Sequence, residues 1–91
     1  MVKIKNREIP ALCLDLGNAR LILAAAPRGY VMCGYLNMQT AEKLGDIACI
    51  VTGVKTIEEL LAKPVVALSE RAKGIGIECG MSGASALEMM I

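Results

Sequence analysis

The apolar residues of this chain come in short runs, and this pattern constrains its fold more than any other feature. The longest strictly apolar run, residues 21–27, covers seven residues, whereas a membrane-spanning helix needs about 20. Turn-forming residues separate the runs, so the sequence predicts short strands and helices in a single domain that spans residues 1–91. The charged N-terminal segment lacks the apolar stretch of a signal peptide. We therefore expect a cytoplasmic protein without a membrane partner.

The proportion of apolar residues indicates self-association. Hydrophobic side chains make up 55% of the 91 residues, yet a chain of this length buries only about 60–65% of its unfolded surface. The apolar surplus must therefore face a partner, and an identical subunit is the commonest solution. We expect the leucines of residues 12–16 and the apolar segment 21–26 to carry this surface.

Alternation and turn residues predict strands in the first third of the chain. Residues 2–9 alternate apolar and polar, as expected for a half-buried strand that Pro10 interrupts. Further strands are expected over residues 11–16, 20–26 and 30–36, joined by turns at residues 17–18 and 27–29. The short turns make these three strands an antiparallel meander. Because residues 20–26 are apolar on both faces, we expect a second layer to cover this sheet.

The rest of the chain mixes short helices and strands. Asn37, Thr56 and Ser82 each precede a helical pattern and are typical N-caps, and Thr56 with Glu59 has the spacing of a capping box. The expected elements are a helix over residues 38–44 that ends at Gly45, a strand over 46–51, helices over 57–63, 64–73 and 83–90, and a brief extended segment over 76–80. This order predicts an α+β fold, with an N-terminal antiparallel β-sheet followed by mixed short helices and strands.

The chain contains no histidine, phenylalanine or tryptophan, and this excludes several kinds of site. Serine–histidine and cysteine–histidine nucleophile pairs cannot form, nor can histidine-bearing zinc sites. Two tyrosines and a net charge of +1 argue against a nucleic-acid partner, because base stacking needs aromatic rings and phosphates need a basic surface. We therefore expect no metal, no cofactor and no nucleic acid. Enzymatic activity stays open, with a non-enzymatic role favoured.

The cysteines are Cys13, Cys33, Cys49 and Cys79, and no two of them form a CxxC or CxC pair. This spacing encodes neither a zinc knuckle nor a thioredoxin-type redox pair. Each cysteine lies among apolar or glycine residues, where a free thiol behaves as a small hydrophobic side chain. We expect four reduced thiols, in agreement with a cytoplasmic location.

The first candidate binding site consists of Gly80, Met81, Ser82 and Gly83. Glycines beside a helix N-cap allow a ligand to approach the backbone closely, and free amides there favour an anion. The alternative is a tight turn capped by Ser82, since the segment lacks the lysine and the spacing of a P-loop. The sequence therefore predicts either a small anionic ligand or a purely structural turn at this segment.

Three further residues are candidates for a reactive or interface role: Tyr30, Cys33 and Lys55. A nucleophilic cysteine needs a cation nearby, and Arg28 is the only local one for Cys33. Structural packing of Cys33 is the alternative. Lys55 directly precedes the helix cap Thr56, which favours a solvated side chain over a buried nucleophile.

Three segments, taken together and in this order, resemble a known family. They are residues 28–34 (RGYVMCG), 53–61 (GVKTIEELL) and 80–87 (GMSGASAL). The combination resembles the YunC-like domains of bacteria and archaea, a family of uncharacterised function, and the similarity runs nearly end to end. The resemblance implies an α+β fold whose N-terminal β region mediates tetramerisation, and it implies no catalytic residue. We therefore expect a homotetramer, with a dimer as the fallback.

Two functional classes stay open. The first is a non-enzymatic homo-oligomeric module that binds a small ligand or serves in assembly. The second is a small enzyme with its site at the subunit interface, using Cys33 or Ser82 with Lys55. The absence of histidine favours the first class, because histidine is the usual proton-transfer group near neutral pH.

Overall fold

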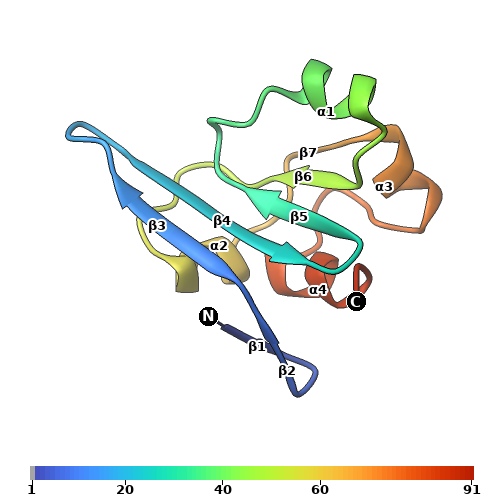
Figure 1. Ribbon diagram of the computed structural model, residues 1–91, viewed down its shortest axis with the longest axis horizontal. Coiled ribbons are helices and arrows are strands. Elements are labelled where there is room, and N and C mark those ends of the chain that lie inside the picture. Colours follow the sequence, from blue (N-terminus) through green and yellow to red (C-terminus); the bar gives the residue numbers. More distant parts are fainter. Residues whose placement is uncertain (1) are drawn as a thin grey trace.

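The computed structural model describes residues 2–91, which form seven strands and four helices. The strands are β1 (Val2–Ile4), β2 (Arg7–Ile9), β3 (Ala11–Asp15), β4 (Arg20–Ala26), β5 (Gly29–Met32), β6 (Ala48–Ile50) and β7 (Ala67–Leu68). The helices are α1 (Met38–Leu44), α2 (Ile57–Ala62), α3 (Glu70–Gly74) and α4 (Gly83–Glu88). Most strands come first in the chain and most helices later, as Figure 1 shows. The predicted α+β class is confirmed.

Five strands form the central sheet in the order β3-β4-β5-β6-β7. The strands β3, β4 and β5 are antiparallel neighbours, so the predicted meander is confirmed. Strand β6 is parallel to β5 and antiparallel to β7. Strand β5 ends at Met32, and the strand predicted over residues 30–36 is therefore too long. The chain turns at this point, where the N–H of Leu36 donates to the carbonyl of Cys33 at 3.2 Å.

The N-terminal segment is a hairpin, and the single strand predicted over residues 2–9 is wrong. Strands β1 and β2 pair antiparallel through a turn at Lys5 and Asn6. Their φ angles of 49° and 64° are the left-handed values that a two-residue hairpin turn requires. Ile4 and Ile9 are both buried although they are an odd number of positions apart, and a single strand would place them on opposite faces. This break in the alternation is the signal of the turn in the sequence. Folding the segment back brings both isoleucines into the core.

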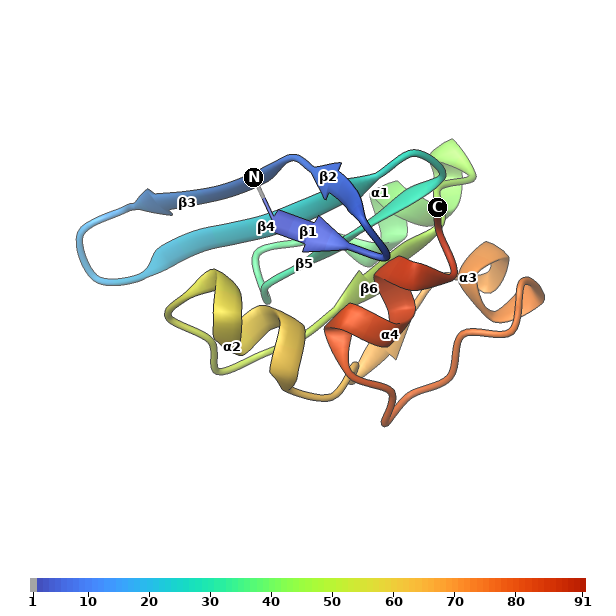
Figure 2. The same cartoon turned by 90° about the horizontal axis from the view of Figure 1, so that it is seen from below.

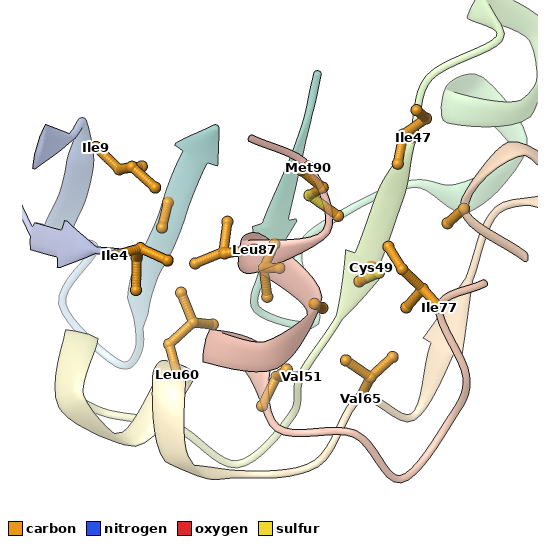
Figure 3. Close-up of a cluster of buried hydrophobic side chains, with 14 of the residues drawn as sticks. Ile4, Ile9, Ile47, Cys49, Val51, Leu60, Val65, Ile77, Leu87 and Met90 are labelled. Atoms are coloured by element: carbon orange, nitrogen blue, oxygen red, sulfur yellow. The ribbon is translucent and has the colours of Figure 1, made fainter. Parts of the chain in front are cut away.

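One face of the central sheet packs against α2, α4 and the β1–β2 hairpin, and the core lies between them (Figures 2 and 3). From the sheet, Ile22, Ala24 and Val31 enter this core, and all three are 0% exposed. Leu60 of α2 and Leu87 of α4 belong to the same buried cluster. The core is therefore built from apolar residues at period two on the strands and from one face of each helix.

The opposite face of β3 and β4 is not covered by any element of residues 2–91. In the antiparallel register Cys13 lies opposite the buried Ile22, so Leu12 and Leu14 point to the other face. These leucines are 46% and 48% exposed. For β3 and β4, the predicted second layer is thus present on the inner face, where Figure 2 shows α2 and α4.

The helix predicted over residues 64–73 forms only in its last part, as α3, and residues 64–69 are extended instead. The N–H of Val65 donates to the carbonyl of Met81 at 2.7 Å, and the chain then pairs with β6 as β7. Ser69 ends this extended stretch, because its side chain caps α3. Pairing with distant segments therefore overcame the helical pattern. The extended segment predicted over residues 76–80 contains turns and no strand.

The helix N-termini predicted at Asn37, Thr56 and Ser82 are confirmed. The side chains of Asn37, Thr56 and Ser82 each accept a hydrogen bond from the backbone N–H three residues later, at 3.1–3.2 Å. Gly45 ends α1 with φ of 72°, a left-handed cap that glycine adopts without strain. No helix within residues 2–91 combines the length and the apolar character needed to cross a membrane.

Candidate functional site

An open pocket of about 600 Å³ lies where the β3–β4 turn approaches the loops that follow β5 and β6. Its wall is made by residues 15, 17–20, 33–35 and 53–55, and we call it the hairpin pocket. Pockets that bind small molecules commonly measure about 300–1,000 Å³. In Figure 1 the β3–β4 hairpin extends beyond the end of β5, which leaves its turn free to form one side of this pocket.

The β3–β4 turn is held by short-range hydrogen bonds. The carboxylate of Asp15 accepts from the N–H of Gly17 at 2.9 Å, and the N–H of Leu16 donates to the carbonyl of Ala19 at 2.8 Å. Gly17 has φ of 97°, a conformation that side chains rarely adopt. The turn predicted at residues 17–18 is therefore present, and it presents Asp15 and Arg20 as cross-strand neighbours.

Arg20 connects this hairpin to the loop after β6. Its guanidinium Nη1 donates to the backbone carbonyl of Lys55 at 3.1 Å. The N–H of Lys55 in turn donates to Glu59 Oε1 at 2.8 Å, while the N–H of Glu59 donates to Thr56 Oγ1 at 3.1 Å. In the predicted capping box the carboxylate reaches the N-cap amide; here Glu59 reaches the amide one residue earlier. The arrangement holds Lys55 at the pocket wall.

Lys63 secures the same loop from the other side. Its Nζ donates to the carbonyl of Gly53 at 2.6 Å and lies 3.8 Å from Glu59 Oε2. Glu59 therefore has a cationic partner of its own, whereas neither Arg20 nor Lys55 forms an ion pair with a carboxylate of residues 2–91. The wall of the hairpin pocket thus carries two cations, neither of them in an ion pair within residues 2–91, and one carboxylate, Asp15.

Cys33 lines the pocket with its sulfur turned toward the backbone. The side chain is 5% exposed. Its Sγ accepts from the N–H of Ile22 at 3.4 Å and donates to the carbonyl of Arg20 at 3.7 Å. A thiol that donates its hydrogen to a carbonyl acts as a packing and hydrogen-bonding group, whereas a nucleophile must give up that hydrogen. The packing interpretation of Cys33 is the one that this geometry favours.

Tyr30 lies apart from Cys33 and Lys55, although the sequence grouped the three. Its hydroxyl donates to Asp46 Oδ2 at 2.8 Å. Burial of the ring raises the pKa of Tyr30 to about 12, and the hydrogen bond and the charge of Asp46 add to this effect. Tyr30 therefore connects β5 to the segment that follows α1. A reactive or interface role for Tyr30 stays a prediction.

The second predicted site, residues 80–83, is engaged with the protein itself. The N–H groups of Gly80 and Gly83 donate to the carbonyls of Val65 and Lys63 at 2.9 Å and 3.1 Å. A Cβ added to Gly83 would collide with the carbonyl oxygen of Leu60, so glycine is required there by close packing. The turn-and-cap interpretation accounts for these residues. Binding of an anion by this segment stays a prediction.

The sequence did not single out Asp15, Arg20 or Tyr35, although all three line the hairpin pocket. The local signal for Asp15 and Arg20 is a charged residue on each side of a glycine–asparagine turn. That signal indicates an exposed hairpin but not what lies beside it, because Arg20 and Lys55 are 35 positions apart. Of the predicted residues, only Cys33 and Lys55 are brought together in this pocket.

The cysteines and acidic residues do not assemble into a metal centre. Within residues 2–91, no group of three or more potential ligands among His, Cys, Asp and Glu is close enough to hold a metal ion. All four cysteines are free thiols, with Cys13 and Cys79 exposed and Cys33 and Cys49 buried. Burial, and to a lesser degree the nearby Cys79, raises the pKa of the Cys49 thiol to about 11.

Comparison with known proteins gives a consistent family assignment. A family model described as a domain of unknown function (DUF1805) matches residues 32–90. The chain is 34% identical over 94 residues to the uncharacterized protein YunC of Bacillus subtilis (strain 168), covering 99% of this chain and 93% of that protein. It also superimposes, with a TM-score of 0.93 and 39% identity, on the crystal structure of a protein of unknown function, TA1206 from Thermoplasma acidophilum, covering 99% of this chain and 88% of that one. The chain therefore belongs to the DUF1805 family of YunC-like domains, whose function is unknown.

Proposed function

We propose that this protein is a non-enzymatic homo-oligomeric module, a homotetramer, that assembles through its N-terminal β region. The observation that carries the proposal is the uncovered apolar face of the β3–β4 hairpin. Leu12 lies opposite Leu23 and Leu14 opposite Leu21, so four leucines share that face. Burying a fully exposed leucine contributes about 1.5–3 kcal/mol, and the half-exposed leucines of β3 would recover part of this in an interface.

The position of β3 supports the same proposal. It is an edge strand of the central sheet, with a neighbour on one side only. Residues 11–14 carry no charge and no proline, the two devices that usually protect an exposed edge from pairing with another chain. An apolar face next to an unprotected edge is a surface that a second copy can cover.

The test of assembly is light scattering coupled to size exclusion at micromolar concentration. We expect a tetramer for the unmodified protein, with a dimer as the fallback, and a smaller species or aggregation for Leu14→Lys. Leu44→Lys is the matched control, because Leu44 is 71% exposed on α1 and far from the hairpin in sequence. A soluble monomer of the unmodified protein would contradict the proposal.

Ile22→Lys is not a suitable variant, although it lies in the same apolar strand. Ile22 is 0% exposed and faces the core, so a lysine there would be buried without a partner and would unfold the subunit. Leu14 lies on the outer face and can be replaced without opening the core. Loss of assembly in Leu14→Lys, with an unchanged circular dichroism spectrum, separates an interface effect from unfolding.

The small-ligand part of the proposal rests on the hairpin pocket. Its volume of about 600 Å³ is within the usual range for small molecules. The competing enzyme hypothesis has one observation in its favour, since Cys33 and Lys55 both line this pocket. However, the sulfur of Cys33 is engaged by two backbone groups, and Ser82 lies outside the pocket as a helix cap. Ligand binding without catalysis is the function that these contacts support.

A further inference from the structure

We propose that the hairpin pocket binds a small organic anion, a carboxylate or a phosphate ester, through Arg20 and Lys55. This inference rests on the ligand-binding part of the proposed function and names the class of ligand. The two cations come from segments 35 residues apart and are joined by the hydrogen bond from the Arg20 guanidinium to the Lys55 carbonyl. Their convergence in one pocket is a property of the tertiary structure.

The charges around the pocket leave room for an anion. Arg20 donates to a neutral carbonyl, and neither it nor Lys55 pairs with a carboxylate of residues 2–91. The nearby Glu59 is occupied by the Lys55 amide and by Lys63. Asp15 is the one carboxylate in the wall, and it accepts from the Gly17 amide. Two like charges in a shared site repel each other, and a bound anion relieves that repulsion.

The rest of the wall indicates that the ligand also has an apolar part. Tyr35, Val54 and Ala19 line the pocket beside the cations, and the ring of Tyr35 is 55% exposed. An exposed aromatic ring offers a flat apolar surface to a ligand, while an arginine provides directed donors for a carboxylate or phosphate. An inorganic ion alone would use only the polar side of this site.

The test is a titration of ¹⁵N-labelled protein followed by nuclear magnetic resonance, with phenyl phosphate, benzoate and the neutral analogue benzamide as probes. We expect phenyl phosphate and benzoate to shift the amides of residues 15–20, 33–35 and 53–55 in a saturable manner, and benzamide to leave them unshifted. Raising the salt from about 50 mM to about 500 mM should weaken binding, because the attraction is screened. The two anionic probes distinguish a phosphate from a carboxylate preference.

Variants of Lys55 provide the control for the charge. No hydrogen bond from its ammonium to residues 2–91 needs to be broken in Lys55→Gln, so the fold should be retained. We expect this variant to weaken binding of the preferred anion by about tenfold or more and Lys55→Arg to restore it. Lys43→Gln, an exposed position on α1, is the matched control and should bind as the unmodified protein does.

Other results of the titration would contradict either the anion proposal alone or the ligand-binding function as well. If benzamide shifts the same amides with an affinity equal to that of benzoate, the pocket binds ligands without regard to charge. The anion proposal is then wrong, and the ligand-binding function survives. If none of the probes shifts those amides, both fail, while assembly is judged separately by light scattering. Unchanged binding in Lys55→Gln would also overturn the proposal.

Discussion

Arg20 and Lys55 are joined by a hydrogen bond of 3.1 Å from guanidinium to backbone carbonyl, across 35 positions of sequence. This contact links the β3–β4 hairpin to the loop that leads into α2. Both segments line the hairpin pocket, so this hydrogen bond connects two parts of its wall.

Replacing this arginine should therefore loosen the loop. We expect Arg20→Gln to lower the free energy of unfolding by about 0.5–1.5 kcal/mol, the usual net value of a hydrogen bond. Amide hydrogen exchange should accelerate most at residues 53–56. Arg7→Gln on the exposed strand β2 is the control. Equal exchange rates at residues 53–56 in both variants would show that the contact does not hold the loop.

Ser82 is expected to stabilise the protein as a helix cap. Its Oγ accepts from the N–H of Ser85 at 3.1 Å, and loss of such a cap costs about 0.5–2 kcal/mol. Urea denaturation of Ser82→Ala should show this loss, while Thr40→Ala on α1 should change little. If phosphate raises the melting temperature of the unmodified protein and of Lys55→Gln but not of Ser82→Ala, residues 80–83 bind the anion as well.

The four thiols should differ in reactivity according to their burial. At pH 8, a thiol with a pKa of about 11, such as Cys49, is ionised in only about one molecule in a thousand. We expect iodoacetamide to modify the exposed Cys13 and Cys79 first, and the buried Cys33 and Cys49 slowly. Mass spectrometry of the native protein measures the order.

The denatured, non-reduced protein provides the complementary measurement. All four cysteines are free, so alkylation in denaturant should add four groups. Two or fewer adducts would mean that a disulfide forms in solution. Rapid modification of Cys33 in the native protein would instead restore the enzyme hypothesis, because it would reveal an accessible thiolate.

The raised pKa of Tyr30 predicts that the folded protein loses stability at high pH. Its pKa is raised from 10.0 to about 12 in the folded protein, so the unfolded chain loses the phenolic proton first. The contribution of Tyr30 is therefore complete below pH 10 and is lost as the pH rises toward 12. Urea denaturation at intervals across this range should show a steeper decline for the unmodified protein than for Tyr30→Phe.

The matched control for this pH dependence is Tyr35→Phe. Tyr35 is 55% exposed, and its replacement should leave the pH profile unchanged. Tyr30→Phe should also be less stable near pH 7 by about 0.5–1.5 kcal/mol, because the hydrogen bond to Asp46 is lost. Identical pH profiles for Tyr30→Phe and the unmodified protein would contradict this assignment.

Several features of the protein are determined locally, by residues only a few positions apart in the sequence. The caps at Asn37, Thr56 and Ser82, and the stop at Gly45, depend on one side chain or one φ angle and on the next three residues. The meander of β3, β4 and β5 is likewise local, because short turns join its strands. For these elements the amino-acid sequence was sufficient to predict the class and, except for the end of β5 at Met32, the position.

Other features depend on partners far along the chain, and only the tertiary structure decided them. Residues 64–73 carry a helical pattern, but only residues 70–73 are helical in α3, while residues 65–69 bond to β6 and to Met81, since the total free energy of pairing outweighs a local preference. The contact of Arg20 with Lys55 has no periodic signal in the sequence. The apolar composition indicated a surface to be covered, and the register of β3 with β4 determined which leucines form it, because one residue of shift would exchange the two faces.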